Sequence, residues 1–353
     1  MEKLKYTRVE ECCEILDSMR IPITASDRKE GKYPYYGANG IQDYVNDYIF
    51  DDELVLLAED GGNFGSKEKP IAYRVSGKCW VNNHAHVLKP KEEIDVDYLC
   101  YSLMFYKVDG MINGATRKKL TQTAMKKMKI PLRNIVEQKK IVQQLNKIIE
   151  IREKAKKELN LLDNLIQARF VEMFGDPITN SKLLPIEKIE ERDFLKAGIT
   201  TKAEDIHDYL KDKYEIPCYG GNGIRGYVEN LSYEGCYPII GRQGALCGNV
   251  QYATGKFHAT EHAVLVSTLK NDNTMWVYYM LKLMDLYRYH TGAAQPGLAV
   301  KKLNTIDVIV ADINLQNQFA AFVHQINKSK FEVQKSLEKT QLLYDSLMQE
   351  YFG

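Results

Sequence analysis

The chain has 353 residues, of which 44% are hydrophobic and 27% charged, so it can form two domains and has the composition of an ordinary globular protein. No run of about eighteen apolar residues predicts a membrane span, and segment 1–14 lacks the apolar core of a signal peptide. We therefore expect a cytoplasmic protein that does not contact a membrane. The formal net charge is +1, which excludes a uniformly basic surface but not basic patches balanced by acidic ones.

Two similar globular regions follow one another along the chain, and both have mixed α/β patterning. Segments 54–58, 237–240 and 263–266 are apolar runs that predict buried strands, and segments 97–104 and 275–286 predict helices. The seven cysteines show no zinc-ligand spacing, so we expect small buried thiols and no metal site.

Each globular region is followed by a segment in which the inner positions are spaced alternately by four and three residues. This spacing over more than four heptads predicts a coiled-coil helix, and a helix from 137 to 174 would be roughly 55 Å long. We expect the two helices to pack antiparallel on each other; the alternative is that each packs only on its own domain. The inner positions are Ile141, Leu145, Ile148, Arg152, Ala155, Leu159, Leu162, Ile166, Arg169 and Met173, then Phe319, Val323, Ile326, Lys330, Val333, Leu337, Thr340, Tyr344, Leu347 and Tyr351.

The chain is an internal repeat. Segment 36–45 (YGANGIQDYV) matches segment 219–228 (YGGNGIRGYV) at an offset of 183, and later matches, such as FG at 174–175 and 352–353, have an offset of 178. A length difference of five residues between Gly65 and His84 explains the change, and the polar segment 66–70 predicts that the extra residues lie in a surface loop. Two long copies predict two similar α/β domains related by pseudo-twofold symmetry, which suits a two-sided partner such as duplex DNA.

These patterns predict four parts: a first domain at 1–134, a central helix at 135–175, a linker and second domain at 176–314, and a C-terminal helix at 315–353. The segment 175–181 (GDPITNS) supplies the glycine, proline and polar residues that end a helix.

Motifs of catalysis are missing from the sequence. There is no Walker A spacing, no Pro-Pro pair for an amino-methyltransferase motif and no H-E-x-x-H. Segment 221–226 fits G-x-G-x-x-G, but no strand–helix pattern surrounds it, and the first copy has Ala38 and Asp43 at two of its three glycine positions. The histidines at 84, 86, 258 and 262 have no acidic or cysteine partner that recurs in both copies. We therefore expect no enzyme activity, no cofactor and no catalytic residue.

The sequence resembles type I restriction–modification specificity subunits over essentially its whole length. The resemblance is carried by the alternation of domains and long helices and by local segments: YGANGI at 36–41 and YGGNGI at 219–224, GRQG at 241–244, VEQKKI at 136–141, LQNQF at 315–319 and FGDP at 174–177. The first copy departs from this pattern, because Glu59 stands where the second has Arg242. Arg242 could donate two hydrogen bonds to a guanine, or bind a phosphate. Glu59 could instead accept a hydrogen bond from the amino group of a cytosine, or have a structural role.

The resemblance implies that each globular half is a target-recognition domain and that the protein binds a bipartite, gapped target in double-stranded DNA. The helices would set the gap and bind two methyltransferase (modification) subunits, and two restriction subunits could join. S-adenosylmethionine and ATP would belong to those partner subunits alone. The alternatives are a stand-alone sequence-specific DNA-binding regulator and an enzyme with an unrecognised site.

To read bases, a protein needs side chains on exposed loops that can form paired hydrogen bonds, such as guanidinium or amide groups. Contacts to phosphates need cationic side chains or backbone N–H groups. In the first domain these criteria select Asn39, Gln42, Asn63, Lys67, Asn83, His84, Arg117, Lys118 and Lys119. In the second domain they select Asn222, Arg225, Arg242, Gln243, Thr260, His262 and Gln295. The alternative for each residue is an ordinary solvated polar side chain.

Overall fold

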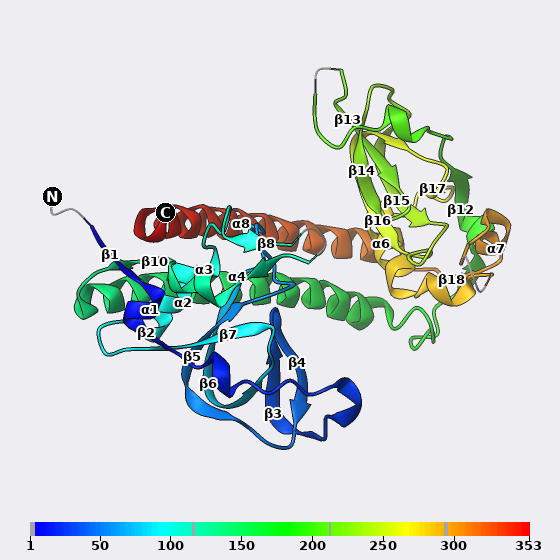
Figure 1. Ribbon diagram of the computed structural model, residues 1–353. Coiled ribbons are helices and arrows are strands. Elements are labelled where there is room, and N and C mark those ends of the chain that lie inside the picture. The colour runs from blue at the N-terminus through cyan, green and yellow to red at the C-terminus, as the bar shows by residue number, and fades with distance from the viewer. Residues whose placement is uncertain (1–3, 115–116, 212, 293–295) are drawn as a thin grey trace. The chain divides into compact units, whose positions relative to one another are not determined.

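The computed structural model describes residues 4–114, 117–211, 213–292 and 296–353 (Figure 1). The chain divides into two compact units, one made of Met1–Ala155 with Ser336–Gly353 and the other of Lys156–Lys335. Each unit therefore contains one sheet domain and about half of each long helix.

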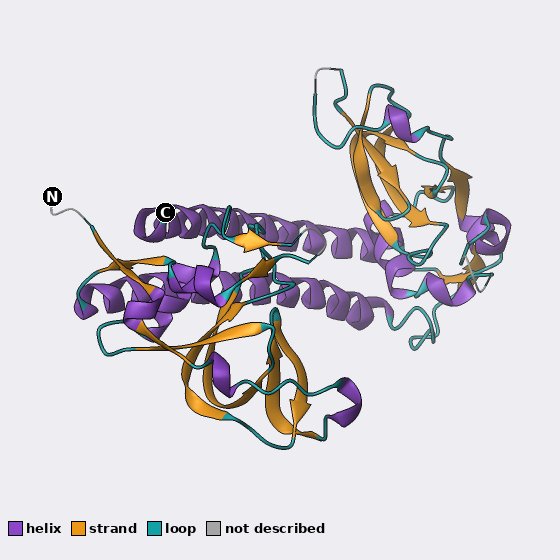
Figure 2. Ribbon diagram, viewed as in Figure 1, coloured by secondary structure: helices purple, strands orange, loops and turns teal. Residues whose placement is uncertain are grey.

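The domain of the first unit is built on a six-stranded sheet in the order β2-β7-β5-β6-β3-β4. All neighbouring strands are antiparallel except β3 and β6, which are parallel. The sheet is strongly curved, as the orange strands in Figure 2 show. Its strands are β2 (Cys13–Ile15), β3 (Glu30–Gly37), β4 (Gly40–Val45), β5 (Phe50–Ala58), β6 (Ala72–Val81) and β7 (Ala85–Pro90).

Short elements complete this domain. They are β1 (Lys5–Arg8) paired with β10 (Lys129–Leu132), β8 (Ile112–Asn113) paired with β9 (Lys119–Leu120), and the helices α1 (Val9–Cys12), α2 (Val96–Met104) and α3 (Gln122–Lys126), with 3₁₀ turns η1 (Asp17–Met19) and η2 (Ala25–Asp27).

The second domain repeats the topology strand for strand, in the order β12-β17-β15-β16-β13-β14, with β13 and β16 parallel. Its strands are β12 (Asp193–Ala197), β13 (Ile216–Gly220), β14 (Gly223–Val228), β15 (Tyr233–Gly241), β16 (Val250–Ala259) and β17 (Ala263–Thr268). The short elements are β11 (Ile186–Lys188) paired with β18 (Asp307–Ile309), α5 (Ile189–Arg192), α6 (Thr274–Leu283), α7 (Val300–Asn304), η3 (Ala203–Asp205) and η4 (Leu286–Tyr289).

The loop that follows the central strand of each sheet, β5 or β15, accounts for the change of offset in the repeat. Residues 59–71 connect β5 to β6, and residues 242–249 connect β15 to β16, so the first loop is five residues longer. The prediction of a surface loop at 66–70 is confirmed. The helix expected at 275–286 ends at Leu283, because Asp285 has φ +48° and the chain turns there.

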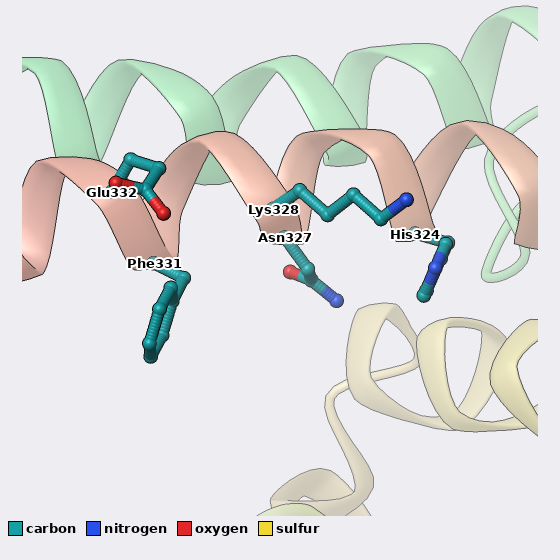
Figure 3. Close-up of a pocket in the computed structure, with 5 residues that line it drawn as sticks. All are labelled: His324, Asn327, Lys328, Phe331 and Glu332. Atoms are coloured by element: carbon teal, nitrogen blue, oxygen red, sulfur yellow. The ribbon is translucent and has the colours of Figure 1, made fainter.

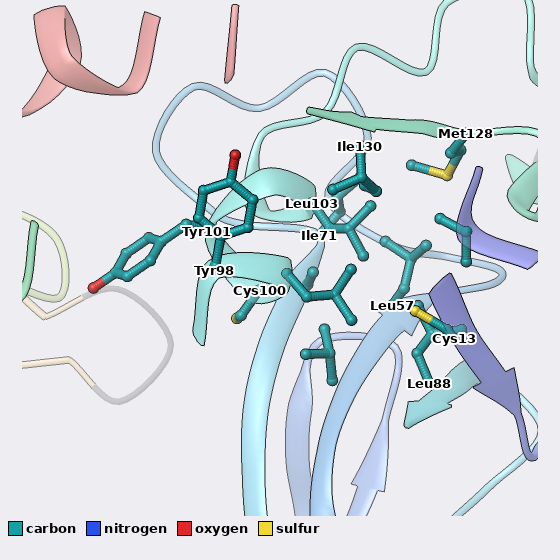
Figure 4. Packing of buried hydrophobic residues seen from close by; sticks show 14 of the residues in the cluster. Cys13, Leu57, Ile71, Leu88, Tyr98, Cys100, Tyr101, Leu103, Met128 and Ile130 are labelled. Carbon is teal, nitrogen blue, oxygen red and sulfur yellow. The ribbon is translucent and has the colours of Figure 1, made fainter. Parts of the chain in front are cut away.

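Apolar side chains from α2 and the sheet form the core of the first domain. Leu57, Leu88, Leu99 and Leu103 have no exposed surface, and Figure 4 shows side chains from strands and helix meeting in one cluster with Ile130. Asp95 caps α2 by accepting from the backbone N–H groups of two residues of its first turn, which fixes where the helix begins.

The long helices α4 (Ile135–Phe174) and α8 (Ile313–Phe352) pair antiparallel within each unit. In the first unit the guanidinium of Arg152 lies 5.5 Å from the ring centroid of Tyr344. In the second, Nζ of Lys330 lies 2.5 Å from Oδ1 of Asp163. All twenty inner positions predicted from the heptads are buried or half-buried, so the coiled-coil prediction is confirmed and the alternative of separate helices is wrong.

Six of the seven cysteines are buried, as predicted, but Cys236 is exposed. Cys236 lies in β15, whose alternate side chains point to opposite faces of the sheet. The buried residues of this strand, such as Ile239 and Ile240, lie nearer its C-terminal end. None of the helices in the described part of the chain contains an apolar stretch of membrane-spanning length.

Candidate nucleic-acid interface

In the first domain, the turns predicted to bind DNA lie beside one another. Nδ2 of Asn39 in the β3–β4 turn donates to the carbonyl of Gly61 at 3.0 Å. The backbone N–H of Glu59 donates to the carbonyl of His84 in the β6–β7 turn at 2.8 Å, and the N–H of Gly61 donates to the carbonyl of Lys118 at 3.1 Å. Four segments that are distant in sequence therefore form one surface.

The other predicted residues of this domain lie on the same surface or beside it. Oε1 of Gln42 accepts from Nδ2 of Asn82 at 3.0 Å. Asn83 and Lys67 are exposed. Asn63 lines a hollow of about 600 Å³, together with Tyr36, Asn39, Gly40, Ile41, Lys69, Pro70 and Tyr73.

Two of the predicted cations of this surface, Arg117 and Lys119, are paired with acids, whereas Lys67 and Lys118 are exposed. Oδ1 of Asp60 lies 2.7 Å from Nη2 of Arg117 and also 2.7 Å from Nδ1 of His84. Nζ of Lys119 lies 3.0 Å from Oε1 of Glu59. A phosphate that approached these cations would meet side chains whose charge is already partly balanced.

On its buried side, Glu59 belongs to a network of ion pairs and hydrogen bonds. Nη1 of Arg20 donates to Oε2 of Glu59 at 2.6 Å and to the carbonyl of Ala85 at 2.8 Å. Nδ1 of His86 lies 2.7 Å from Oδ2 of Asp17, which also accepts from Gln122 at 2.9 Å. Of the two roles left open for Glu59, these contacts favour the structural one.

The carboxylates of Asp17 and Glu59, with a ring nitrogen of His86, lie within 4.8 Å of one another, a spacing that a metal ion could bridge. The guanidinium of Arg20 already occupies this cluster, and a second cation beside it would be repelled. We therefore assign the cluster to the ion-pair network that holds the β5–β6 loop against the sheet.

This network makes the stability of the first domain sensitive to acid. Burial would raise the pKa values of Asp17 and Glu59, but hydrogen bonds from His86 to Asp17 and from Arg20 to Glu59 hold both below their ordinary values. A lowered pKa contributes stability above the unfolded-state value, and this is lost as pH falls through the folded value. Glu59→Gln is expected to lower the unfolding free energy by about 1–3 kcal/mol near neutral pH and by less near pH 3. Denaturation followed at Trp80 measures it, and an equal loss at both pH values would contradict the assignment.

The second domain brings the corresponding residues together with different chemistry. The backbone N–H of Arg242 donates to the carbonyl of His262 at 3.1 Å. A Cβ added to Gly241 would lie 2.1 Å from the carbonyl oxygen of Gly221, so the β13–β14 turn lies directly on this strand end. Asn222 in that turn accepts a hydrogen bond from Asn249.

Within the described residues, Arg242 is not held by ion pairs of the kind that engage Glu59. In the described part of the chain its Nε has no hydrogen-bond partner, and neither do Nδ1 of His262 and Oγ1 of Thr260. Nε2 of His262 lies 3.3 Å from a carboxylate oxygen of Glu261. These unpartnered atoms are buried, and Arg242 as a whole is half-buried, so only part of its side chain reaches the surface.

The other residues predicted to bind DNA in the second domain are Arg225, Gln243 and Gln295. Arg225 is exposed on β14, with its side chain against Gly220, and Gln243 is exposed and forms a backbone bridge with Gly297. Gln295 lies outside the described residues. The sequence did not point to Asp17, Arg20 and Asn249, which contact predicted residues or their neighbours. No local pattern marks them, because only the tertiary fold brings them to this candidate surface.

The family model for the type I restriction modification DNA specificity domain matches residues 1–161 and 186–342, which is most of the chain and both copies of the repeat. The chain belongs to this family. The type I restriction enzyme EcoprrI specificity subunit of Escherichia coli is 46% identical over 133 residues, which cover 38% of this chain and 33% of that protein. The chain therefore matches about a third of the length of this curated specificity subunit.

Solved structures show the same fold. The specificity subunit of a type I restriction–modification system from M. genitalium has a TM-score of 0.65 at 16% identity, and the match covers 100% of this chain and 97% of that one. A chain from a structural study of complex assembly and conformational transition in the type I restriction–modification system has a TM-score of 0.58 at 14% identity, and the match covers 100% and 99%. The paired arrangement of specificity domains and long helices is thus a fold that these proteins share.

Proposed function

We propose that this chain is the DNA sequence-recognition subunit of a type I restriction–modification complex. Each domain would read one half of a bipartite, gapped target in double-stranded DNA. The observation that carries the proposal is the repeated surface: in each domain the turn holding Asn39 or Asn222 lies on the end of the central strand, beside the turn holding His84 or His262. Two copies of one reading surface suit two half-sites.

The two surfaces are expected to read different bases. Arg242 can donate two parallel hydrogen bonds to the O6 and N7 atoms of guanine in the major groove. Glu59, at the corresponding position, is engaged by Arg20 and Lys119, so the first domain would rely on amides such as Asn39 and Asn63. We therefore propose an asymmetric target with a guanine contact in the half read by the second domain.

The chain would carry no chemistry of its own. In this proposal two modification subunits bind the helices, supply S-adenosylmethionine and methylate adenine, and two restriction subunits that use ATP can join them. The complex would act in the cytoplasm, where its DNA lies. One helix face suited to a partner is on α8, where Phe331 is 65% exposed among His324, Asn327, Lys328 and Glu332 (Figure 3).

Substitution of Arg242 tests the base-reading role. Arg242→Gln is expected to relax the choice at one base position of one half-site by about 1–3 kcal/mol, or roughly 5- to 150-fold. Binding of the complex with its modification subunit would be measured on duplexes that vary at each base pair of the target in turn. Lys256→Gln is the matched control, because it removes the same charge at the other end of the β15–β16 hairpin. Equal weakening on every sequence would reassign Arg242 to a phosphate, and unchanged binding would remove it from the interface.

A further inference from the structure

A fully buried glutamine stands in the first turn of each long helix. Gln138 in α4 and Gln316 in α8 both have 0% exposed surface, and they are separated by the 178-residue offset of the repeat. A glutamine amide is rarely buried unless its donors and acceptor are satisfied. The contacts of both amides are therefore informative.

Gln138 joins the start of α4 to the domain of the first unit. Its Oε1 accepts from the backbone N–H of Asp95 at 2.8 Å. Its Nε2 donates to the carbonyls of Glu93 and Arg133, both at 2.8 Å. Asp95 is the N-cap of α2, which packs on the sheet, whereas Arg133 lies in the lead into α4. One side chain thus ties the long helix to the loop that begins the domain helix.

Gln316 forms the same joint in the second unit. Its Oε1 accepts from the backbone N–H of Asn273, the N-cap of α6, at 2.8 Å. Its Nε2 donates to Oδ1 of Asp272 at 2.7 Å and to the carbonyl of Ala311 at 3.0 Å. The carboxylate of Asp272 also pairs with Arg192, next to the edge strand β12. The joint is therefore connected to the sheet as well as to the domain helix.

We propose that Gln138 and Gln316 are positioning residues that fix the direction in which each long helix leaves its domain, and thereby the gap length that the protein accepts between its half-sites. Apolar packing holds two elements together but is not directional. Three hydrogen bonds with fixed geometry hold the helix at one angle to the domain. The inference rests on the proposed function, because gap length has a meaning only for a reader of two half-sites.

The test uses the full chain in complex with its modification subunit. Gln138→Met and Gln316→Met keep the side-chain volume but remove all three hydrogen bonds. Methylation would be measured on duplexes whose half-sites are constant and whose gap is shortened or lengthened by one and two base pairs. Each variant is expected to lose roughly three- to tenfold of its discrimination between neighbouring gaps, while the bases read in each half stay the same.

Two controls separate positioning from general stability. Gln318→Met changes an exposed glutamine two residues from Gln316, and Leu54→Ala destabilises a separate buried cluster of the first domain that contains no residue of the joint. Both are expected to keep the wild-type gap preference. A wild-type complex that modifies no gapped target would overturn the proposed function; a gap preference unchanged in both methionine variants would overturn this inference alone.

Hydrogen exchange of the wild-type protein gives a measurement that does not depend on the variants folding. The N–H groups of Asp95 and Asn273 precede their helices and have the buried glutamine oxygens as acceptors. We expect these two amides to exchange far more slowly than those of exposed residues in loops, such as Lys67 and Ala245. Exchange at the rate of those loops would show that the joints are open and would contradict the inference.

Discussion

Phe170→Ala is expected to lower the unfolding free energy of the second unit by about 3–5 kcal/mol, among the largest effects of any single substitution in this chain. Phe170 has 0% exposed surface, and its ring centroid lies 5.0 Å from that of Phe174, 5.4 Å from Phe319 and 6.5 Å from Trp276. Alanine would leave a cavity at the point where α4, α8 and α6 meet.

Denaturant unfolding of the full chain measures this loss, and Trp276 reports on the second unit because it lies in the same aromatic cluster. The matched control is Val171→Ala, whose side chain is 43% exposed and which is expected to change stability by about 0.5 kcal/mol or less. A loss below about 1 kcal/mol for Phe170→Ala would contradict the packing described for α4 and α8 in this unit.

Asp193→Asn is expected to stabilise the second domain at alkaline pH and to have little effect in mild acid. Asp193 is 2% exposed, and its Oδ1 has no hydrogen-bond partner among the described residues. Burial raises the pKa of this carboxyl to about 7; the charge of Asp272 adds to the increase, and Arg192 opposes it. The folded protein therefore holds a proton that the unfolded chain releases at lower pH.

The pH dependence follows from this difference. Below the unfolded pKa, near 4, both states are protonated and stability is fully present; it falls as pH rises towards 7. The shift corresponds to a loss on the order of 4 kcal/mol above pH 7. Asparagine cannot ionise, so the variant should exceed the wild type by about 1–4 kcal/mol at pH 8 and converge with it near pH 4. Denaturation across this range measures it, with exposed Asp205→Asn as control; identical pH profiles for wild type and Asp193→Asn would refute the prediction.

The repeat and the helices could be predicted because their signals are local. The positions selected by heptad spacing, including Arg152 and Lys330, are all buried or half-buried, although Phe170, whose ring packs on Phe319, is not among them. The change of offset located the longer loop between β5 and β6. These features depend on residue spacing along one segment, which sequence preserves.

The strand order and the inner chemistry of the interface could not be predicted in this way. The parallel pairing of β3 with β6, and of β13 with β16, joins strands that are distant in sequence. The engagement of Glu59 by Arg20, and the buried contacts of Gln138, depend on tertiary packing, which no periodicity records. The repeat shows that Glu59 and Arg242 occupy equivalent positions in the two copies. Only the contacts in the folded protein distinguish an acid with a structural role from a residue that could contact bases.

Methylation mapping tests the central claim most directly. The chain would be expressed with its modification subunit in a host that lacks adenine methylation, and the host genome would then be sequenced by a method that detects modified bases. We expect N6-methyladenine on both strands of one bipartite, asymmetric motif with a constant gap. In Arg242→Gln we expect the same motif with one guanine position relaxed to other bases. A well-expressed complex that leaves no mark, or that marks an ungapped motif, would contradict the account.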